Sequence, residues 1–160
     1  DADEEFPSKK QRRHAAALDL SRSNMPFVPD ELRAYPQLAD RLLALDLSRN
    51  QLFGSDHVFS IVGELRQLRT LDLSENFLNG PLSERCGRLE TLEHLALDGN
   101  QLTGLPDAIG ALRRLRHVSM ARNAIGPVLP DAVGDWADVR FVNVRSNLLA
   151  RLPATLGGWR

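Results

Sequence analysis

Two histidines hold the same place in two stretches of the chain that otherwise differ in charge. His94 lies in LEHLALDGNQL (residues 92–102) and His117 lies in LRHVSMARNAI (residues 115–125). A pair of imidazoles can share a metal ion or respond together to pH near neutrality. Zinc sites use three or four protein ligands, and two histidines without a third ligand do not make one. We therefore predict no metal site and no cofactor.

The same stretch also holds the residue types of a serine nucleophile and its base. His117 and Ser119 are two positions apart, and Asp98 lies in the neighbouring stretch. Residues two apart on an extended strand share one face, so this spacing follows from strand periodicity alone. An open sheet gives little desolvation and no oxyanion pocket. The chain also lacks G-x-S-x-G, H-E-x-x-H and a phosphate-binding glycine loop. No catalytic residue is predicted.

The composition bounds the partners that the chain can bind. Its 160 residues are 42% hydrophobic and 26% charged with a formal net charge of −1, which gives no overall attraction to nucleic acid. The longest stretch without Asp, Glu, Lys or Arg has eight residues, so no membrane insertion is expected. Cys86 is the single cysteine, and no asparagine begins a glycosylation sequon; both features favour a cytoplasmic location. The first residues, DADEEFPSKKQRR, lack the apolar core of a secretory signal.

The two histidines belong to a repeat that runs through most of the chain. Its frame is L-x-x-L-x-L-x-x-N-x-L, of which LLALDLSRNQL is a typical copy. Six copies start at Ala15, Leu42, Leu68, Leu92, Leu115 and Val139. Their starts are 27, 26, 24, 23 and 24 residues apart, and the first copy is the weakest. Within each copy apolar and other residues alternate, which predicts a short strand.

This frame resembles the leucine-rich repeat family, and the resemblance covers residues 15–160. It implies an α/β fold: a horseshoe-shaped solenoid with a parallel β-sheet on the concave face and short helical or irregular segments on the convex face. Residues 1–14 are charged and are expected to form a tail or linker. The next copy would start near residue 162, so we expect the repeats to continue beyond Arg160.

One asparagine follows the strand of each copy, where the chain must turn. An amide side chain can satisfy backbone groups that such a turn leaves unpaired in the interior. Stacked coil upon coil, these residues are expected to form a ladder along the core: Asn50, Asn76, Asn100, Asn123 and Asn147.

The segments between the strands have a second pattern. An apolar residue followed by glycine, as in Cys86-Gly87, recurs six residues before each copy from the third onward. The pattern predicts an inward side chain followed by close backbone passage at the glycine. Cys86 is therefore expected to be a small buried hydrophobe. The first two outer segments, 26–41 and 53–67, are longer and predict loops, one of which holds His57.

Positions three, five and seven of each copy are expected to face the concave side. In the first three copies they hold small residues and a column of aspartates, Asp19, Asp46 and Asp72. This column either attracts a cationic partner or is ordinary filling of the LDLS frame. In the last three copies aromatic residues and arginine appear, which are enriched in binding hot spots. The predicted protein-binding patch comprises His94, Asp98, His117, Arg122, Phe141 and Arg145. The alternative is that solvent positions drift and the interface lies in other repeats.

The sequence thus predicts a non-catalytic module that binds a protein or peptide partner, within an intracellular scaffold or signalling regulator. The stretch LPDAIGALRRLRHV resembles intracellular Ras-associated repeats, whereas LSENFLNGPL and ARNAIGPVLPDAVG resemble plant-type repeats. The paired cysteines that cap plant-type ectodomains are missing from this sequence. Two alternatives stay open: a regulatory or targeting region of a larger enzyme such as a kinase, and the ectodomain of a membrane receptor.

Overall fold

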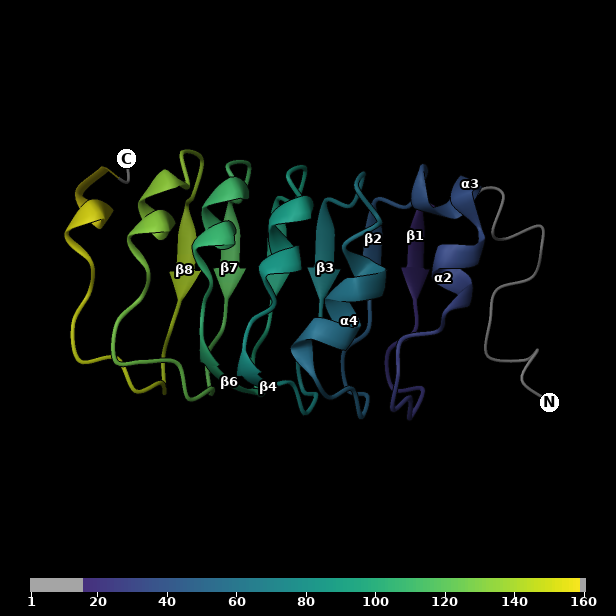
Figure 1. Cartoon of the computed structure of the whole chain (residues 1–160), viewed down its shortest axis with the longest axis horizontal. Helices are drawn as coiled ribbons and strands as arrows, with labels where there is room; N and C mark the ends of the chain where they lie inside the picture. The colour runs from purple at the N-terminus through teal and green to yellow at the C-terminus, as the bar shows by residue number, and fades with distance from the viewer. Residues whose placement is uncertain (1–15, 159–160) are drawn as a thin grey trace.

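The computed structural model describes residues 16–158, whose backbone forms a stack of coils (Figure 1). Each coil contributes one short strand to a six-stranded parallel sheet in the order β1-β2-β3-β5-β7-β8. These strands are Ala17–Asp19, Ala44–Asp46, Thr70–Asp72, His94–Ala96, His117–Ser119 and Phe141–Asn143. The predicted leucine-rich repeat solenoid is confirmed. The expected tail at 1–14 and the first repeat residue, Ala15, lie outside the described residues.

Short helices cover the other side of this sheet (Figure 1). The α-helices are α2 (Glu31–Ala34), α3 (Pro36–Ala39) and α4 (Ser55–Val62). The later coils carry 3₁₀ helices: η1 (Glu84–Arg88), η2 (Asp107–Ala111), η3 (Asp131–Asp135) and η4 (Ala154–Gly158). A second, two-stranded parallel sheet pairs β4 (Asn79–Pro81) with β6 (Gln101–Gly104) along one edge of the solenoid (Figure 1).

The prediction of loops over 26–41 and 53–67 is wrong, because both segments contain helices. His57 consequently lies in α4. Val58, Ile61 and Val62 recur at helical spacing and are all buried, so this helix forms by burying one apolar face against the core.

The asparagines join successive coils through their side-chain amides. Asn76 shows the pattern: its Oδ1 accepts the backbone N–H of Leu52 at 3.0 Å, and its Nδ2 donates to the carbonyls of Leu47 at 3.0 Å and Leu73 at 3.1 Å. Equivalent bonds are made by Asn50, Asn100, Asn123 and Asn147. The first three ladder residues are buried, and the last two are half-buried. The amides thus satisfy backbone groups of the turns inside the core.

Glycine lets the outer segments approach closely. A Cβ added at Gly87 would lie 2.9 Å from the carbonyl oxygen of Ala108, and one at Gly110 would lie 2.8 Å from that of Ala132. Both distances are shorter than van der Waals contact allows, so any side chain here would push adjacent coils apart.

Three residues after each strand of the six-stranded sheet, just before the ladder position, one residue adopts a left-handed conformation. In the third coil this residue is Glu75, with φ 54°, and in the fifth it is Arg122, with φ 54°. The backbone still pairs across coils at this point, since the N–H of Glu75 donates to the carbonyl of Asp98 at 2.7 Å. In four of the six coils this turn places an exposed, charged side chain just after the strand, namely Arg22, Arg49, Glu75 and Arg122.

Candidate protein-binding surface

Three rings lie side by side on the concave face, one from each of β5, β7 and β8. The strand register pairs His94 with His117 and His117 with Phe141. The two imidazoles are stacked with ring centroids 4.8 Å apart and planes 12° apart. The phenyl ring follows at 6.2 Å and 32° from His117. We call these three residues the ring column.

The ring column is more exposed toward its Phe141 end. His94 is half-buried, His117 is exposed, and 51% of Phe141 is accessible to solvent. A large apolar ring at that exposure contributes little to the core. It offers the apolar contact area that aromatic side chains supply at interfaces.

Charged residues immediately precede the rings in sequence. Glu93 lies between two arginines, with Arg116 at 3.6 Å and Arg69 at 3.9 Å. The carboxylate side chain is 22% exposed, whereas the arginines are 46% and 60% exposed. The acidic group is therefore covered by its own neighbours, and the guanidinium groups face solvent.

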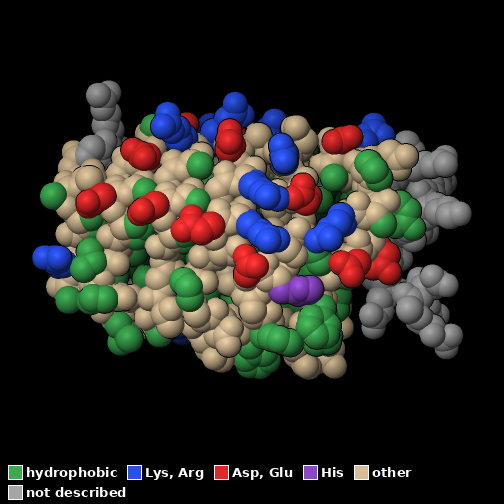
Figure 2. Space-filling view, viewed as in Figure 1, with side chains coloured by type: hydrophobic (Ala, Val, Ile, Leu, Met, Phe, Trp, Pro, Cys, Tyr) green, Lys and Arg blue, Asp and Glu red, His purple; other side chains and the backbone are tan. Residues whose placement is uncertain are grey.

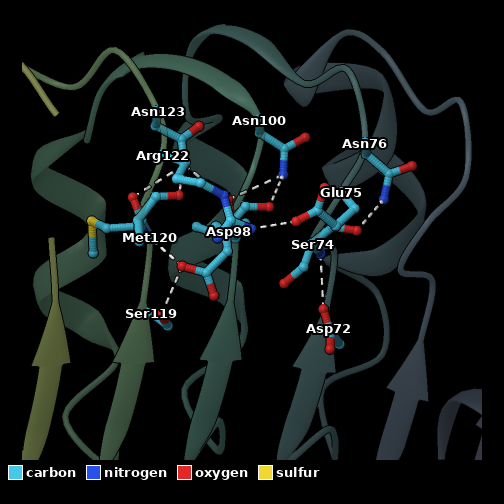
Figure 3. A network of polar contacts seen from close by, with 12 residues as sticks. Asp72, Ser74, Glu75, Asn76, Asp98, Asn100, Ser119, Met120, Arg122 and Asn123 are labelled. Atoms are coloured by element: carbon cyan, nitrogen blue, oxygen red, sulfur yellow. Dashed lines mark hydrogen bonds and ion pairs between the residues drawn. The ribbon is translucent and has the colours of Figure 1, made fainter. Parts of the chain in front are cut away.

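Asp98, one of the predicted binding residues, is half-buried and already engaged within the sheet. Its Oδ1 accepts the hydroxyl of Ser119 at 2.7 Å and the backbone N–H of Ala121 at 2.6 Å (Figure 3). In the first three coils an aspartate at position five accepts the backbone N–H two residues on. The fifth coil has Ser119 at position five. There the backbone N–H two residues on, that of Ala121, donates instead to Asp98 of the preceding coil.

Arg122 is also engaged, since it forms an ion pair with Glu75 across the intervening coil (Figure 3). The side chains are 53% and 48% exposed, so water screens the pair. Arg145, in contrast, is exposed and makes no ion pair with any residue of the described range 16–158. Its backbone N–H donates to Oδ1 of Asn143 at 3.1 Å.

The aspartate column has a structural role in the first three coils. Oδ1 of Asp19, Asp46 and Asp72 accepts the N–H of the serine two residues on, at 2.9, 2.9 and 2.8 Å. The backbone N–H of Ser21, supported by its hydroxyl, holds the pKa of Asp19 below its usual value. These bonds explain why aspartate fills the LDLS frame without invoking a cationic ligand.

A shallow polar hollow of about 450 Å³ runs along the ends of the first strands. It is lined by Ser21, Arg22, Asp46, Ser48, Arg49, Asp72, Ser74, Glu75, Asp98 and Arg122. It holds four carboxylates and three guanidinium groups, so the two signs of charge nearly balance. It adjoins the ring column through Asp98 and Arg122.

The structure thus brings together three of the six predicted binding residues as a ring column, His94, His117 and Phe141. Asp98 bonds to residues of the next coil, Arg122 pairs with Glu75 two coils away, and Arg145, two residues beyond β8, forms no ion pair within residues 16–158. The hydroxyl of Ser119 donates to Asp98, which removes it from a His117–Ser119 pair. No group of three or more His, Cys, Asp or Glu suited to a metal ion occurs among residues 16–158.

A model of the family described as leucine rich repeat matches residues 66–125. That match covers the third to fifth coils, with strands β3, β5 and β7 and the ladder residues Asn76, Asn100 and Asn123. The chain belongs to the leucine-rich repeat family. Leucine-rich repeat chains typically act as non-catalytic protein-binding modules. Within residues 16–158, no helix is long and apolar enough to cross a membrane.

The leucine-rich repeat chain is similar to proteins that differ widely in size. Adenylate cyclase of Schizosaccharomyces pombe is 35% identical over 109 residues, which are 68% of this chain and 6% of the cyclase. A leucine-rich repeat protein of Leptospira interrogans has a TM-score of 0.81 at 27% identity, over 93% of this chain and 36% of that one. The BIR2 ectodomain of Arabidopsis thaliana has a TM-score of 0.64 at 29% identity, over 86% of this chain and 68% of that ectodomain. The chain therefore spans a small part of the cyclase and about a third of the Leptospira protein.

The structure of this repeat chain also shows an aromatic cluster that sequence reasoning missed. Phe27 packs edge-on against Phe53 at 5.3 Å and against His57 at 5.6 Å. Phe53 forms a parallel bridge with Phe77, and all three phenylalanines are about half exposed. Hydrophobic side chains gather at the lower edge in Figure 2, beside a histidine. These phenylalanines stand at unequal offsets from the repeat asparagine, so aligning the copies did not bring them into one column.

Proposed function

We propose that this chain is a non-catalytic module that binds a protein or peptide partner on its concave face, with the ring column as the centre of contact. The observation that carries the proposal is Phe141, half exposed and in register with two stacked histidines. Aromatic side chains add large contact area at little cost in conformational entropy. A column of rings across adjacent strands therefore suits a partner that lies over several coils.

We further propose that this module is part of an intracellular scaffold or signalling regulator in the cytoplasm. The buried free thiol of Cys86 is compatible with a reducing environment. Two similarities favour other settings. Similarity to part of a cyclase supports a regulatory region within a larger enzyme. Similarity to the BIR2 ectodomain supports a receptor's outer domain. The complete open reading frame, with a fluorescent fusion to locate its product, discriminates among the three.

Photo-crosslinking tests the binding surface directly. Benzoylphenylalanine is placed at position 141 on β8 and, as a control, at position 111, an exposed alanine in the outer 3₁₀ helix η2. We expect a discrete crosslinked partner from the source cells at position 141 and none at position 111. A partner identified in this way should then lose binding to the Phe141→Ala, Arg145→Glu variant. Equal crosslinking at both positions would overturn the proposal.

A further inference from the structure

Arginines gather in the residues next to β7 and β8 in the last two coils. Residues 116–122 and 140–146 together hold four arginines and no carboxylate. Glu75 neutralises Arg122, and Arg116 shares Glu93 with Arg69. Arg140 and Arg145, by contrast, are exposed and form no ion pair with any residue between 16 and 158. Asp138 is also exposed, two residues before Arg140, so residues 138–146 hold two arginines and one carboxylate and keep an excess of positive charge beside β8.

These two arginines flank Phe141, whose ring is half exposed. Arg140 directly precedes Phe141, and Arg145 follows four residues after it. An extended strand rises about 3.3 Å per residue, which places both backbones within roughly 15 Å of the ring. A guanidinium side chain at each end of β8 can therefore reach a ligand that lies on Phe141.

We infer that the partner segment held by the ring column is an acidic peptide stretch with an aromatic or large aliphatic side chain; this inference rests on the proposed function. The apolar side chain packs on Phe141 and His117. Carboxylates on either side of it pair with Arg140 and Arg145, whose planar guanidinium groups suit bidentate contact with carboxylate oxygens. A basic segment would meet these arginines unfavourably, and Glu93 and Asp98, in the coil of His94, are already occupied.

Selection from a random linear-peptide display library tests the inference separately from the proposed function. Wild-type chain is the target, and synthetic copies of the enriched peptides are then titrated by fluorescence anisotropy. The test variants are Phe141→Ala and the double reversal Arg140→Glu, Arg145→Glu. The matched control is Arg113→Glu, Arg114→Glu, which reverses two exposed arginines that follow the outer helix η2. Thermal melts establish that all variants are folded.

We expect the enriched peptides to be acidic and to contain an aromatic or large aliphatic residue. Their affinity should fall at least about tenfold with Phe141→Ala and with the double reversal at 140 and 145, and should hold in the control. Added salt should weaken binding, since the guanidinium groups are exposed. A lysine-substituted version of the peptide should prefer the double-reversal variant.

Neutral or basic peptides that still require Phe141 would overturn the inference while supporting the proposed function. Acidic peptides that bind Phe141→Ala and the double reversal as tightly as wild type would contradict both. A designed peptide that alternates glutamate with phenylalanine is titrated whatever the selection yields. If neither it nor any selected peptide binds, the inference fails.

Discussion

Glu75 and Arg122 form an ion pair although they stand 47 positions apart in the sequence, one in the third coil and the other in the fifth. Gly99 occupies the same repeat position in the coil between them, with φ +64°. A Cβ at Gly99 would lie 2.8 Å from Oε1 of Glu75. The pair can therefore cross the fourth coil because that coil presents no side chain at this point.

Gly99→Ala should lower the free energy of unfolding by more than its backbone conformation alone explains. Alanine at positive φ costs about 1 kcal/mol, and the added methyl must also displace the Glu75 carboxylate. The matched control is Gly80→Ala, at φ +69° with no atom within 4 Å of the added Cβ. Urea unfolding of both variants checks this prediction. Equal losses would show that the carboxylate simply moves aside.

Gly110→Ala should destabilise the chain by about 1–3 kcal/mol, as overpacking in a close-packed region does. The new methyl would meet the carbonyl of Ala132 at 2.8 Å, and backbone yields less readily than a side chain. Gly157→Ala is the control, because the same repeat position in the last described coil has nothing within 4 Å. Thermal melts should show a clear drop for Gly110→Ala and a small change for Gly157→Ala. Similar melting temperatures would contradict close passage at this glycine.

The repeat register was predictable because the same backbone period places each leucine and each asparagine. Aligning the copies was enough to place His94, His117 and Phe141 on neighbouring strands. The partners of Asp98 and Arg122 were not predictable, because they depend on side-chain rotamers and on the space left by Gly99. Sequence spacing gives the position of a side chain but not the direction in which it turns.

Helix α4 was missed for a different reason. The stretch SDHVFSIV has apolar residues at helical spacing, which is a readable signal. The coil containing it is longer than the later ones, and length alone favoured a loop. The burial of Phe59 and its apolar neighbours favours a helix, because a helix lets these side chains pack together against the core.

Asn100→Ala should cost about 1–3 kcal/mol of unfolding free energy. The substitution leaves the N–H of Leu78 and the carbonyl of Leu73 without the side-chain partners that they have at 3.0 and 2.9 Å. Asn147→Ala should cost less, because this residue is half-buried and water can replace its amide. Asn79→Ala, in exposed strand β4, serves as the control. Urea unfolding that ranks Asn147→Ala level with Asn100→Ala would count against the water argument.

Cys86 should resist alkylation in the folded protein. The side chain is 0% exposed, and burial, with a smaller contribution from the Glu84 carboxylate, raises the pKa of its thiol to about 12. The thiolate is the nucleophile, so iodoacetamide should react in mildly alkaline buffer only when the chain unfolds. Mass spectrometry with and without urea checks this. Rapid labelling of the native chain would show that the outer segment at η1 opens readily.

The same pKa shift predicts how stability changes with pH. In the unfolded chain the thiol loses its proton near its ordinary pKa of 9.0, whereas in the fold it holds the proton up to about 12. Between pH 9.0 and about 12, ionisation of the thiol stabilises only the unfolded state. The free energy of unfolding is therefore unaffected by this thiol below pH 9.0 and falls as the pH rises from 9.0 toward 12. Other groups titrate there as well, but equally in wild type and in Cys86→Ala. Wild type should therefore lose stability relative to Cys86→Ala above that pH, and parallel pH profiles from thermal melts would show that the buried thiol reaches water in the native state.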